Sequence, residues 1–315
     1  MIVTLTMNPS VDRTVALDEL TLGATNRVRE ARVNGSGKGI NVSLALKKLG
    51  ISSTAAGILA GREGQFVEDT VRSAGITPYF TWLKQGATRV NTKVFESKHN
   101  RTTEINEPGP QVGAEDEAAL WRDLKAVVPG ADYLICAGSL PPGVEPGFYR
   151  RLTSWCRERG VKVCLDASGK ALMEGVRAQP FMIKPNEDEV EQLLGWRPAG
   201  KEQMLTAVQR LAGLGPEIVI VSLGGEGAVF YRRGEDVLWA RAQAEPLAST
   251  AGCGDALVAG VISSLLAGRT WEELVCWSVA VATATAEIFG TEFPTVHHVQ
   301  RALERVIIEK LNSVR

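Results

Sequence analysis

The chain has 315 residues, of which 44% are hydrophobic, and this is enough for a large packed core. Its formal net charge of -1 at pH 7 argues against electrostatic binding to nucleic acids or to membrane surfaces. No apolar run approaches the roughly 20 residues of a membrane span, and the first residues lack the basic start of a signal peptide. The 5 cysteines are scattered and form no CxxC pair, as in proteins with reduced thiols, so we expect a cytoplasmic protein.

Short apolar runs rich in β-branched residues alternate with helical patterns along most of the chain. The predicted strands are Ile2–Thr6, Ser53–Ile58, Tyr133–Ala137, Lys162–Asp166, Phe181–Lys184 and Ile218–Ser222. The predicted helices are Gly39–Leu49, Gln65–Ser73, Asp116–Val127, Gly147–Glu158, Asp188–Leu194, Met204–Leu214, Asp255–Leu266, Trp271–Phe289 and Val296–Leu311. This alternation predicts an α/β fold with a mainly parallel sheet covered on both faces, and such sheets bind ligands at the carboxyl ends of their strands.

Two stretches, Asp12–Val33 and Thr88–Asn106, break this alternation and look like strands of alternating character. Arg89, Asn91 and Lys93 occupy every second position, so they share one face of a strand. We expect a small, half-exposed sheet that is either a lid over the site or an edge that pairs with another subunit. The simplest organisation is a single domain of residues 1–315 with lid strands inserted from about 12–33 and 88–106.

The most informative segment is the glycine-rich turn before a predicted apolar helix that starts at Asp255. The backbone N–H groups of Gly252, Cys253 and Gly254 are expected to be unpaired donors at the helix N-terminus, a ready site for an anion. Asp255 would repel a phosphate but could take the proton of a hydroxyl that attacks one. The segment therefore suggests phosphoryl transfer to an alcohol, and it fits equally well an ordinary loop with an acid in the first helical turn.

The segment Gly35–Asn41 does not match a P-loop, because Arg32 stands where the first glycine is needed and Gly39 where Ser or Thr is needed. We expect a turn that lets the backbone approach a ligand, with Lys38 near an anion and Asn41 bonded to hydroxyls. The alternative is a glycine loop that serves only as a turn.

Four further segments have a functional and a structural interpretation. Ser222–Ala228 precedes a strand-like run, which disfavours a Rossmann fingerprint and favours a glycine hairpin against a flat ligand such as a nucleotide. Asn186 and Glu189 could hold Mg²⁺ through its water shell, and the simpler interpretation is a capping box; both can hold. Asp12 and Gly138–Gly143 each follow a predicted strand, where they could contact a ligand or form only a turn.

Together these segments resemble the PfkB, or ribokinase-like, family of carbohydrate kinases over essentially the whole chain. The resemblance rests on Thr6–Asp12, Gly37–Val42, Thr88–Lys93, Glu104–Pro110, Gly138–Gly143, Lys184–Asn186 and Ser249–Asp255. Within the family, Asn8–Asp12 and Thr88–Lys93 resemble the branch of 1-phosphofructokinases and tagatose-6-phosphate kinases, and Glu104–Pro110 favours the former. The resemblance implies a three-layer αβα fold with a small β-sheet lid, and ATP and Mg²⁺ as cofactors.

The resemblance also implies roles for matching residues. Asp255 is the implied catalytic base, and Gly252, Cys253 and Gly254 are the implied anion hole. The implied substrate ligands are Asp12, Arg27, Gly37, Lys38, Asn41, Arg89, Asn91, Lys93 and Ser139, and the cations among them would neutralise the phosphate of the substrate. The implied ATP contacts are Lys184, Asn186, Ser222, Gly224 and Gly227, and the residues tied to Mg²⁺ are Asn186 and Glu189.

Two residues depart from the family's usual pattern. Cys253 replaces an alanine of the anion hole, and its thiol is expected to be acidified by the helix N-terminus. Ser36 replaces a glycine and would be strained if its φ were positive.

The predicted activity is ATP-dependent phosphorylation of fructose 1-phosphate to fructose 1,6-bisphosphate. Tagatose 6-phosphate and fructose 6-phosphate are the alternative substrates, a neutral sugar or nucleoside is a further one, and a non-catalytic sugar-phosphate sensor is the least favoured. The expected partners are the phosphosugar and ATP, without nucleic acid or membrane, and the lid strands could pair across a homodimer.

Overall fold

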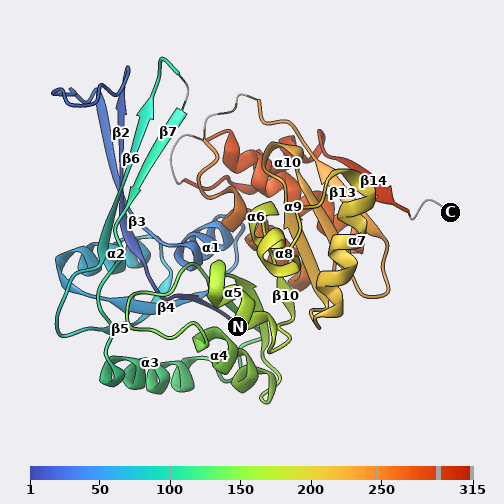
Figure 1. The fold of residues 1–315 in the computed structure, drawn as a ribbon, viewed down its shortest axis with the longest axis horizontal. Helices are drawn as coiled ribbons and strands as arrows, with labels where there is room; N and C mark the ends of the chain where they lie inside the picture. The colour runs from blue at the N-terminus through green and yellow to red at the C-terminus, as the bar shows by residue number, and fades with distance from the viewer. Residues whose placement is uncertain (100, 246, 248, 289–291, 313–315) are drawn as a thin grey trace.

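The computed structural model describes residues 1–99, 101–245, 247, 249–288 and 292–312, and Figure 1 shows a large and a small sheet with helices around the large one. The strands of the large sheet are β1 (Ile2–Thr6), β4 (Thr54–Leu59), β5 (Thr77–Trp82), β8 (Tyr133–Ala137), β9 (Lys162–Asp166), β10 (Met182–Ile183), β11 (Ile218–Ser222), β12 (Ala228–Arg232), β13 (Val237–Arg241) and β14 (Ile307–Leu311). Their order is β14-β13-β12-β11-β10-β9-β8-β1-β4-β5.

All strands from β5 across to β11 pair in parallel, and β12, β13 and β14 continue the sheet with antiparallel pairs. The central strands β1 and β8 are buried along their whole length, as strands covered on both faces must be. The predicted, mainly parallel sheet is therefore confirmed, and the carboxyl ends of β1, β8, β9, β10 and β11 lie along one edge.

Helices cover both faces of this sheet. They are α1 (Lys38–Lys48), α2 (Gly61–Ser73), α3 (Ala114–Val127), α4 (Phe148–Arg157), α5 (Gly169–Val176), α6 (Glu187–Leu194), α7 (Gly200–Gly213), α8 (Cys253–Leu266), α9 (Trp271–Ala286) and α10 (Val296–Leu303). One core cluster joins a face of the sheet to α3 through α7, and a second joins the opposite face to α1, α8, α9 and α10. The three-layer αβα fold is thus confirmed. None of the helices in the described ranges has the length and hydropathy that crossing a bilayer requires.

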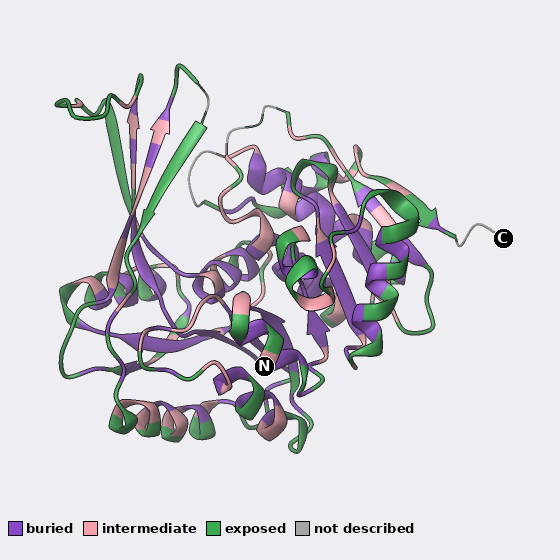
Figure 2. Cartoon of the chain, viewed as in Figure 1, coloured by how far each residue is buried: buried purple, intermediate pink, exposed green. Residues whose placement is uncertain are grey.

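The small sheet consists of β2 (Ser10–Leu17), β3 (Glu30–Ser36), β6 (Arg89–Glu96) and β7 (Arg101–Asn106), in the order β3-β2-β6-β7. It projects from the end of the large sheet next to α2, and its outer strands are largely exposed (Figure 2). At its base, Val11 and Val90 pack with Val67 of α2. The predicted small, half-exposed sheet is confirmed, and its strands extend beyond residues 12–33 to Ser10 and Ser36.

The predicted helix Val296–Leu311 is wrong in its second half. α10 ends at Leu303, and the chain turns with Val306 N–H bonded to the carbonyl of Leu303. The next residues form β14, which pairs antiparallel with β13 and covers the edge that β13 would otherwise leave open. β-branched residues at Ile307 and Ile308 favour the extended form. The predicted helix Trp271–Phe289 ends at Ala286, and Phe289 lies outside the described residues.

Candidate active site

Charged side chains gather where the parallel strands end. β9 ends at Asp166, which is 2% exposed, and Lys184 directly follows β10. Asp166 lies between two ammonium groups, with Oδ1 3.2 Å from Lys38 Nζ and Oδ2 3.3 Å from Lys184 Nζ. Burial would raise the pKa of Asp166, but the two lysines hold it below its ordinary value. Asp166 is therefore an ionised, buried carboxylate that fixes Lys38 and Lys184 at the edge of the sheet.

The predicted anion hole lies at the start of α8. Gly252 caps this helix with a left-handed φ of 78°, and a Cβ there would lie 3.3 Å from the ring of Phe293. The Cys253 N–H is 3.4 Å from the carbonyl of Thr250, whereas the N–H groups of Gly254 and Asp255 have no backbone partner among the described residues. Lys184 approaches the same turn, because its Nζ lies 3.5 Å from where a Cβ on Gly254 would be. The helix N-terminus therefore offers an anion free donors and a nearby ammonium.

Asp255, in the first turn of α8, is 6% exposed. Burial raises its pKa to about 6; Asp166 adds to the rise, and Lys38, Lys184 and a hydrogen bond from Asn41 oppose it. That hydrogen bond joins Asn41 Nδ2 to Asp255 Oδ2 at 2.8 Å. A buried carboxylate whose pKa lies just below neutrality is ionised at pH 7 yet basic enough to accept a proton, as general-base catalysis requires.

Cys253 is next to this carboxylate, and its predicted acidity is wrong. Burial, with the charge of Asp255 second, raises the pKa of the thiol to about 12. The helix N-terminus that was expected to stabilise a thiolate is outweighed, so the thiol is protonated at neutral pH.

The glycine-rich segment joins the small sheet to the site. β3 ends at Ser36 and α1 begins at Lys38, with Gly37 at a φ of 144° between them. A Cβ on Gly37 would lie 2.6 Å from Thr6 Cγ2, so only glycine fits this turn. The first turn of α1 then places both Lys38 and Asn41 in the site. Ser36 is unstrained, since the described part of the chain has a positive φ outside glycine only at Gln179.

Polar side chains line one face of the small sheet, as predicted for Arg89, Asn91 and Lys93. Asp12 pairs with Asn91 in the register of β2 and β6, and its Oδ1 and Oδ2 accept hydrogen bonds from Asn91 Nδ2 at 3.2 Å and Lys93 Nζ at 2.9 Å. Burial would raise the pKa of Asp12, but Lys93 and the hydroxyls of Ser10 and Ser36 hold it below its ordinary value. Asp12 is thus an ionised hydrogen-bond acceptor at the base of the sheet.

Arg89 is held by backbone carbonyls at the same place. Its Nη1 and Nη2 donate to the carbonyls of Glu107 and Asn8, and its buried Nε has no partner among the described residues. Asn8 Nδ2 lies 3.4 Å from the hydroxyl of Ser139, so the loop after β8 joins this group. Buried donors normally have an acceptor, and for this one the described residues do not supply it.

Asn186 and Glu189 form the capping box that the sequence suggests. Glu189 N–H donates to Asn186 Oδ1 at 2.8 Å, and Asn186 N–H donates to Glu189 Oε2 at 2.9 Å. Burial, and then the charge of Asp166, raise the pKa of Glu189. A cation near these two buried carboxylates would relieve their repulsion, so the residues fit a hydrated Mg²⁺. No group of three His, Cys, Asp or Glu side chains in the described part of the chain forms a direct metal site.

The predicted nucleotide contacts follow β10 and β11. Asn186 pairs with Ser222 in a parallel bridge, which brings the two loops together. Gly224 begins a short 3₁₀ turn, and a Cβ there would meet nothing within 4 Å, whereas a Cβ on Gly227 would lie 2.1 Å from the carbonyl of Ala240. Packing thus explains Gly227 by itself, and Gly224 is exposed.

Arg27 is the one predicted substrate ligand that the described structure does not bring to this group. It is exposed in the loop that joins β2 to β3. The last pair of β2 and β3 before this loop is Ala16 with Glu30. Ala16 is four residues from Asp12 along β2, which corresponds to roughly 13 Å of strand.

Asp166 is the site residue that sequence reasoning missed. It was assigned only to the end of the predicted strand Lys162–Asp166. The carboxyl end of a parallel strand is itself the signal, because such ends meet at the ligand-binding edge.

The chain matches one known protein family over most of its length. The model of the pfkB family carbohydrate kinases matches residues 5–297. The chain is 33% identical over 311 residues to the 1-phosphofructokinase of Bacillus subtilis (strain 168), covering 99% of this chain and 100% of that protein. It is also 33% identical to a tagatose-6-phosphate kinase of Staphylococcus epidermidis, over 87% of this chain and 88% of that one.

Solved structures show the same fold. A possible 1-phosphofructokinase from Thermotoga maritima has a TM-score of 0.91 at 27% identity, over 99% of this chain and 100% of that one. Phosphofructokinase-2 from Escherichia coli, solved with substrates and products, has a TM-score of 0.89 at 26% identity, over 96% of this chain and 98% of that one. With this fold, this site and the family match over most of its length, the chain belongs to the pfkB family of carbohydrate kinases.

Proposed function

We propose that this protein transfers the γ-phosphoryl group of ATP to fructose 1-phosphate and produces fructose 1,6-bisphosphate. The observation that carries the proposal is Asp255, a buried carboxylate with a pKa of about 6 beside free N–H groups at the start of α8. A base next to an anion site is what phosphoryl transfer to an alcohol needs. The names of the relatives favour a phosphorylated ketose as acceptor.

In the proposed reaction, Asp255 accepts the proton of the acceptor hydroxyl while its oxygen forms a bond to the γ-phosphorus. The bond from that phosphorus to the bridging oxygen breaks, and ADP leaves. The N–H groups of Gly254 and Asp255 and the ammonium of Lys184 stabilise charge on the transferred group. Asn41 keeps the carboxylate oriented through its 2.8 Å hydrogen bond.

Lys184, Asn186, Ser222, Gly224 and Gly227 are the proposed nucleotide contacts. Asn186 and Glu189 would hold Mg²⁺ through water, and the bound ion would neutralise charge on the phosphates.

The acceptor is proposed to lie under the small sheet, which serves as the lid of a single kinase domain. Asp12 and Asn91 would bind sugar hydroxyls, next to the backbone at Gly37 and the hydroxyl of Ser139. Arg89 and Lys93, with Lys38 towards α8, would neutralise the phosphate already on the sugar. Lys93 also pairs with Asp12 and Lys38 with Asp166, whereas Arg89 donates to backbone carbonyls alone. Arg89 therefore favours a phosphorylated acceptor over a neutral sugar, because beside a neutral ligand it would have no anion to bind. Arg27 stands apart from the group in this conformation.

The experiment is ADP release by the purified protein with MgATP and, in turn, fructose 1-phosphate, tagatose 6-phosphate, fructose 6-phosphate and fructose. We expect the highest kcat/KM for fructose 1-phosphate. A preference for tagatose 6-phosphate or fructose 6-phosphate would overturn the substrate and keep the base. Equal activity on free fructose would remove the role of the cations, and no ADP release with any acceptor would favour a sugar-phosphate sensor.

We also propose a cytoplasmic homodimer. All 5 cysteines are free, as expected in a reducing compartment. Val33 on β3 and Ile105 on β7 are exposed, and the register places them in one row across the small sheet with Arg13 and Thr92. Two exposed apolar side chains, one on each outer strand of the sheet, fit pairing with a second copy.

A further inference from the structure

A cavity of about 520 Å³ lies at the amino ends of β9, β10 and β11. Lys162 opens β9, Phe181 precedes β10 and Glu217 precedes β11, and all three line the cavity. The opposite ends of the same strands lead to Asp166, Lys184 and Ser222. The cavity is therefore separated from the proposed active site by the full length of the strands, and it has the size of a small-ligand site.

The walls of the cavity carry an excess of positive charge. Arg157, Lys162 and Arg233 line it, and none of the three has a carboxylate partner within 4.0 Å in the described part of the chain. The one acidic side chain among the lining residues, Glu217, already pairs with Arg232 at 3.5 Å. Three cations against one neutralised carboxylate favour a ligand with two negative charges.

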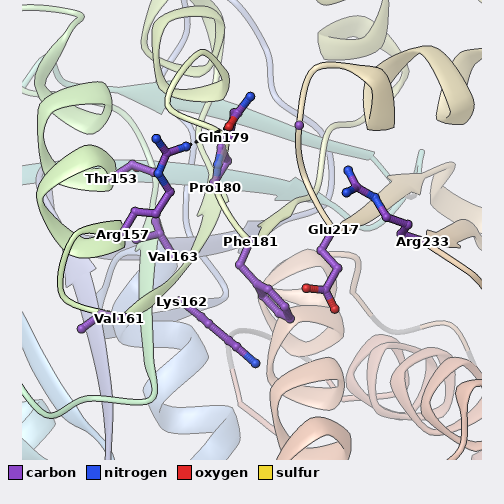
Figure 3. A pocket seen from close by; sticks show the side chains of 12 residues that line it. Thr153, Arg157, Val161, Lys162, Val163, Gln179, Pro180, Phe181, Glu217 and Arg233 are labelled. Atoms are coloured by element: carbon purple, nitrogen blue, oxygen red, sulfur yellow. Dashed lines mark hydrogen bonds between the residues drawn. The ribbon is translucent and has the colours of Figure 1, made fainter.

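An aromatic ring lies between these charges. Figure 3 shows Phe181 between the side chains of Arg157 and Gln179 on one side and those of Glu217 and Arg233 on the other. Lys162 Nζ lies 4.8 Å from the centroid of the Phe181 ring. A ligand seated here would meet an apolar surface as well as cations.

Thr153 supplies an unsatisfied polar group to the same cavity. This residue is 1% exposed, and its hydroxyl oxygen has no hydrogen-bond partner among the described residues. Buried hydroxyls normally have a partner, since leaving one without a partner destabilises the fold. The wall of the cavity thus contains a polar group that the described residues leave unsatisfied.

Gln179 forms part of the cavity wall and is bonded to Arg157. Arg157 Nη1 donates to Gln179 Oε1 at 2.8 Å, and Gln179 has a φ of 56°. A Cβ on the neighbouring Gly215 would lie 2.4 Å from the Gln179 side chain, so glycine is required there. Backbone in this uncommon region is typical of helix ends, and Gln179 follows α5 with its N–H bonded to the carbonyl of Val176.

We propose that this cavity binds a small organic phosphate monoester with a flat apolar body. Such a monoester carries close to two negative charges at neutral pH, which matches the charge excess. Arg157 and Arg233 are the side chains suited to phosphate oxygens, and Phe181 packs against the body of the ligand.

Isothermal titration with phenyl phosphate, which has both parts, tests this assignment. We expect binding to the unchanged protein at millimolar or lower concentration, at least tenfold weaker binding to the double variant K162A/R233A, and unchanged binding to R159A. Arg159 is the matched control, because it lies 4.5 Å over the ring of Trp155 and does not line the cavity. Inorganic phosphate, which lacks the ring, is expected to bind more weakly than phenyl phosphate.

Two results would overturn the proposal: no binding to the unchanged protein, or equal binding to K162A/R233A, which would place the anion in the active site. ADP release by the double variant checks that it folds, because neither residue belongs to the proposed catalytic group. If the double variant is inactive, the variant F181A is used in its place, because it removes the ring and keeps the cations. Unchanged affinity of F181A for phenyl phosphate would contradict the assigned cavity.

Discussion

Asp255 meets opposite demands from folding and from catalysis. Burial raises its pKa from 3.8 to about 6, so the folded protein favours the neutral carboxyl. The protonated residue therefore stabilises the folded state relative to the unfolded state. This stabilisation is fully present below the pKa of Asp255 in the unfolded chain, and it is lost as the pH rises through its pKa in the folded protein. A shift of this size corresponds to a loss on the order of 2–3 kcal/mol above pH 7. The proposed reaction needs the ionised form, so the pH range of activity is the range in which the residue destabilises the fold.

We expect Asp255→Asn to lower kcat roughly 10²–10⁴-fold and to raise the free energy of unfolding. The amide oxygen can still accept the hydrogen bond from Asn41, and no buried charge remains. The stability gain should be larger at pH 8 than at pH 5, measured by urea unfolding. In the unchanged protein, kcat should rise with pH through about 6 and then level off.

Asp69→Asn is the matched control, because Asp69 is exposed on α2, and it should change neither quantity. Near-normal turnover of the Asp255 variant would remove the base from the mechanism. An equal or smaller stability gain at pH 8 than at pH 5 would contradict the raised pKa.

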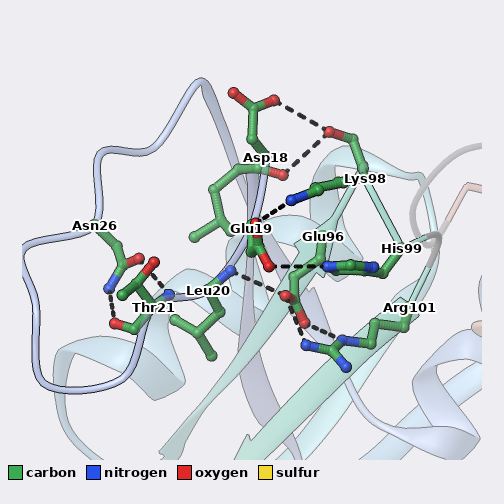
Figure 4. Close-up of polar contacts among 11 residues, drawn as sticks. Asp18, Glu19, Leu20, Thr21, Asn26, Glu96, Lys98, His99 and Arg101 are labelled. Atoms are coloured by element: carbon green, nitrogen blue, oxygen red, sulfur yellow. Dashed lines mark hydrogen bonds and ion pairs between the residues drawn. The ribbon is translucent and has the colours of Figure 1, made fainter.

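At the scale of elements, the loop between β2 and β3 is tied to the β6–β7 hairpin by buried Glu96 (Figure 4). Glu96 Oε1 accepts hydrogen bonds from Leu20 N–H and from Arg101 Nη2, both at 2.9 Å. Hydrogen bonds from Arg101, followed by the one from Leu20, lower the pKa of Glu96 to about 2. The carboxylate therefore stays ionised, and this contact persists, over the physiological pH range.

Glu96→Gln should loosen this loop, because an amide NH₂ next to Arg101 replaces an acceptor with a donor. We expect amide hydrogen exchange at Leu20 to accelerate severalfold, measured by mass spectrometry or NMR. Glu104→Gln, an exposed change on β7, should leave it unaltered. Equal protection in the two variants would show that Glu96 does not anchor the loop.

How much of these elements the sequence could predict depended on whether the signal was local. The polar face of β6 follows from alternation alone, and the capping box of Asn186 and Glu189 from a spacing of three. The pairing of Asp166 with Lys38 joins residues 128 apart, so no local pattern contains it. β14 was assigned to a helix because five residues of helix and of edge strand differ little in composition, and only β13 decides between them.

At the scale of the whole molecule, the exposed row on the small sheet predicts the oligomeric state. We expect Ile105→Lys, which puts a charge in the row, to convert the proposed homodimer to a monomer in light scattering after gel filtration. Ile307→Lys is the control, since Ile307 is 62% exposed against 59% for Ile105 but lies on β14, outside the small sheet. A monomeric unchanged protein, or a dimer that survives Ile105→Lys, would contradict pairing through the small sheet.

The turn at Gly37 has a consequence for protein engineering. β3 and α1 are one uninterrupted stretch, and Gly37 alone separates the strand that pairs with the Asp12 strand from the helix whose Asn41 holds Asp255. In a chimera that takes its small sheet from another kinase, a junction at this turn would therefore shift Asn41 and, with it, Asp255. Its junction belongs before Ser36, so that the residues from Ser36 to Asn41 come from the same parent as α8.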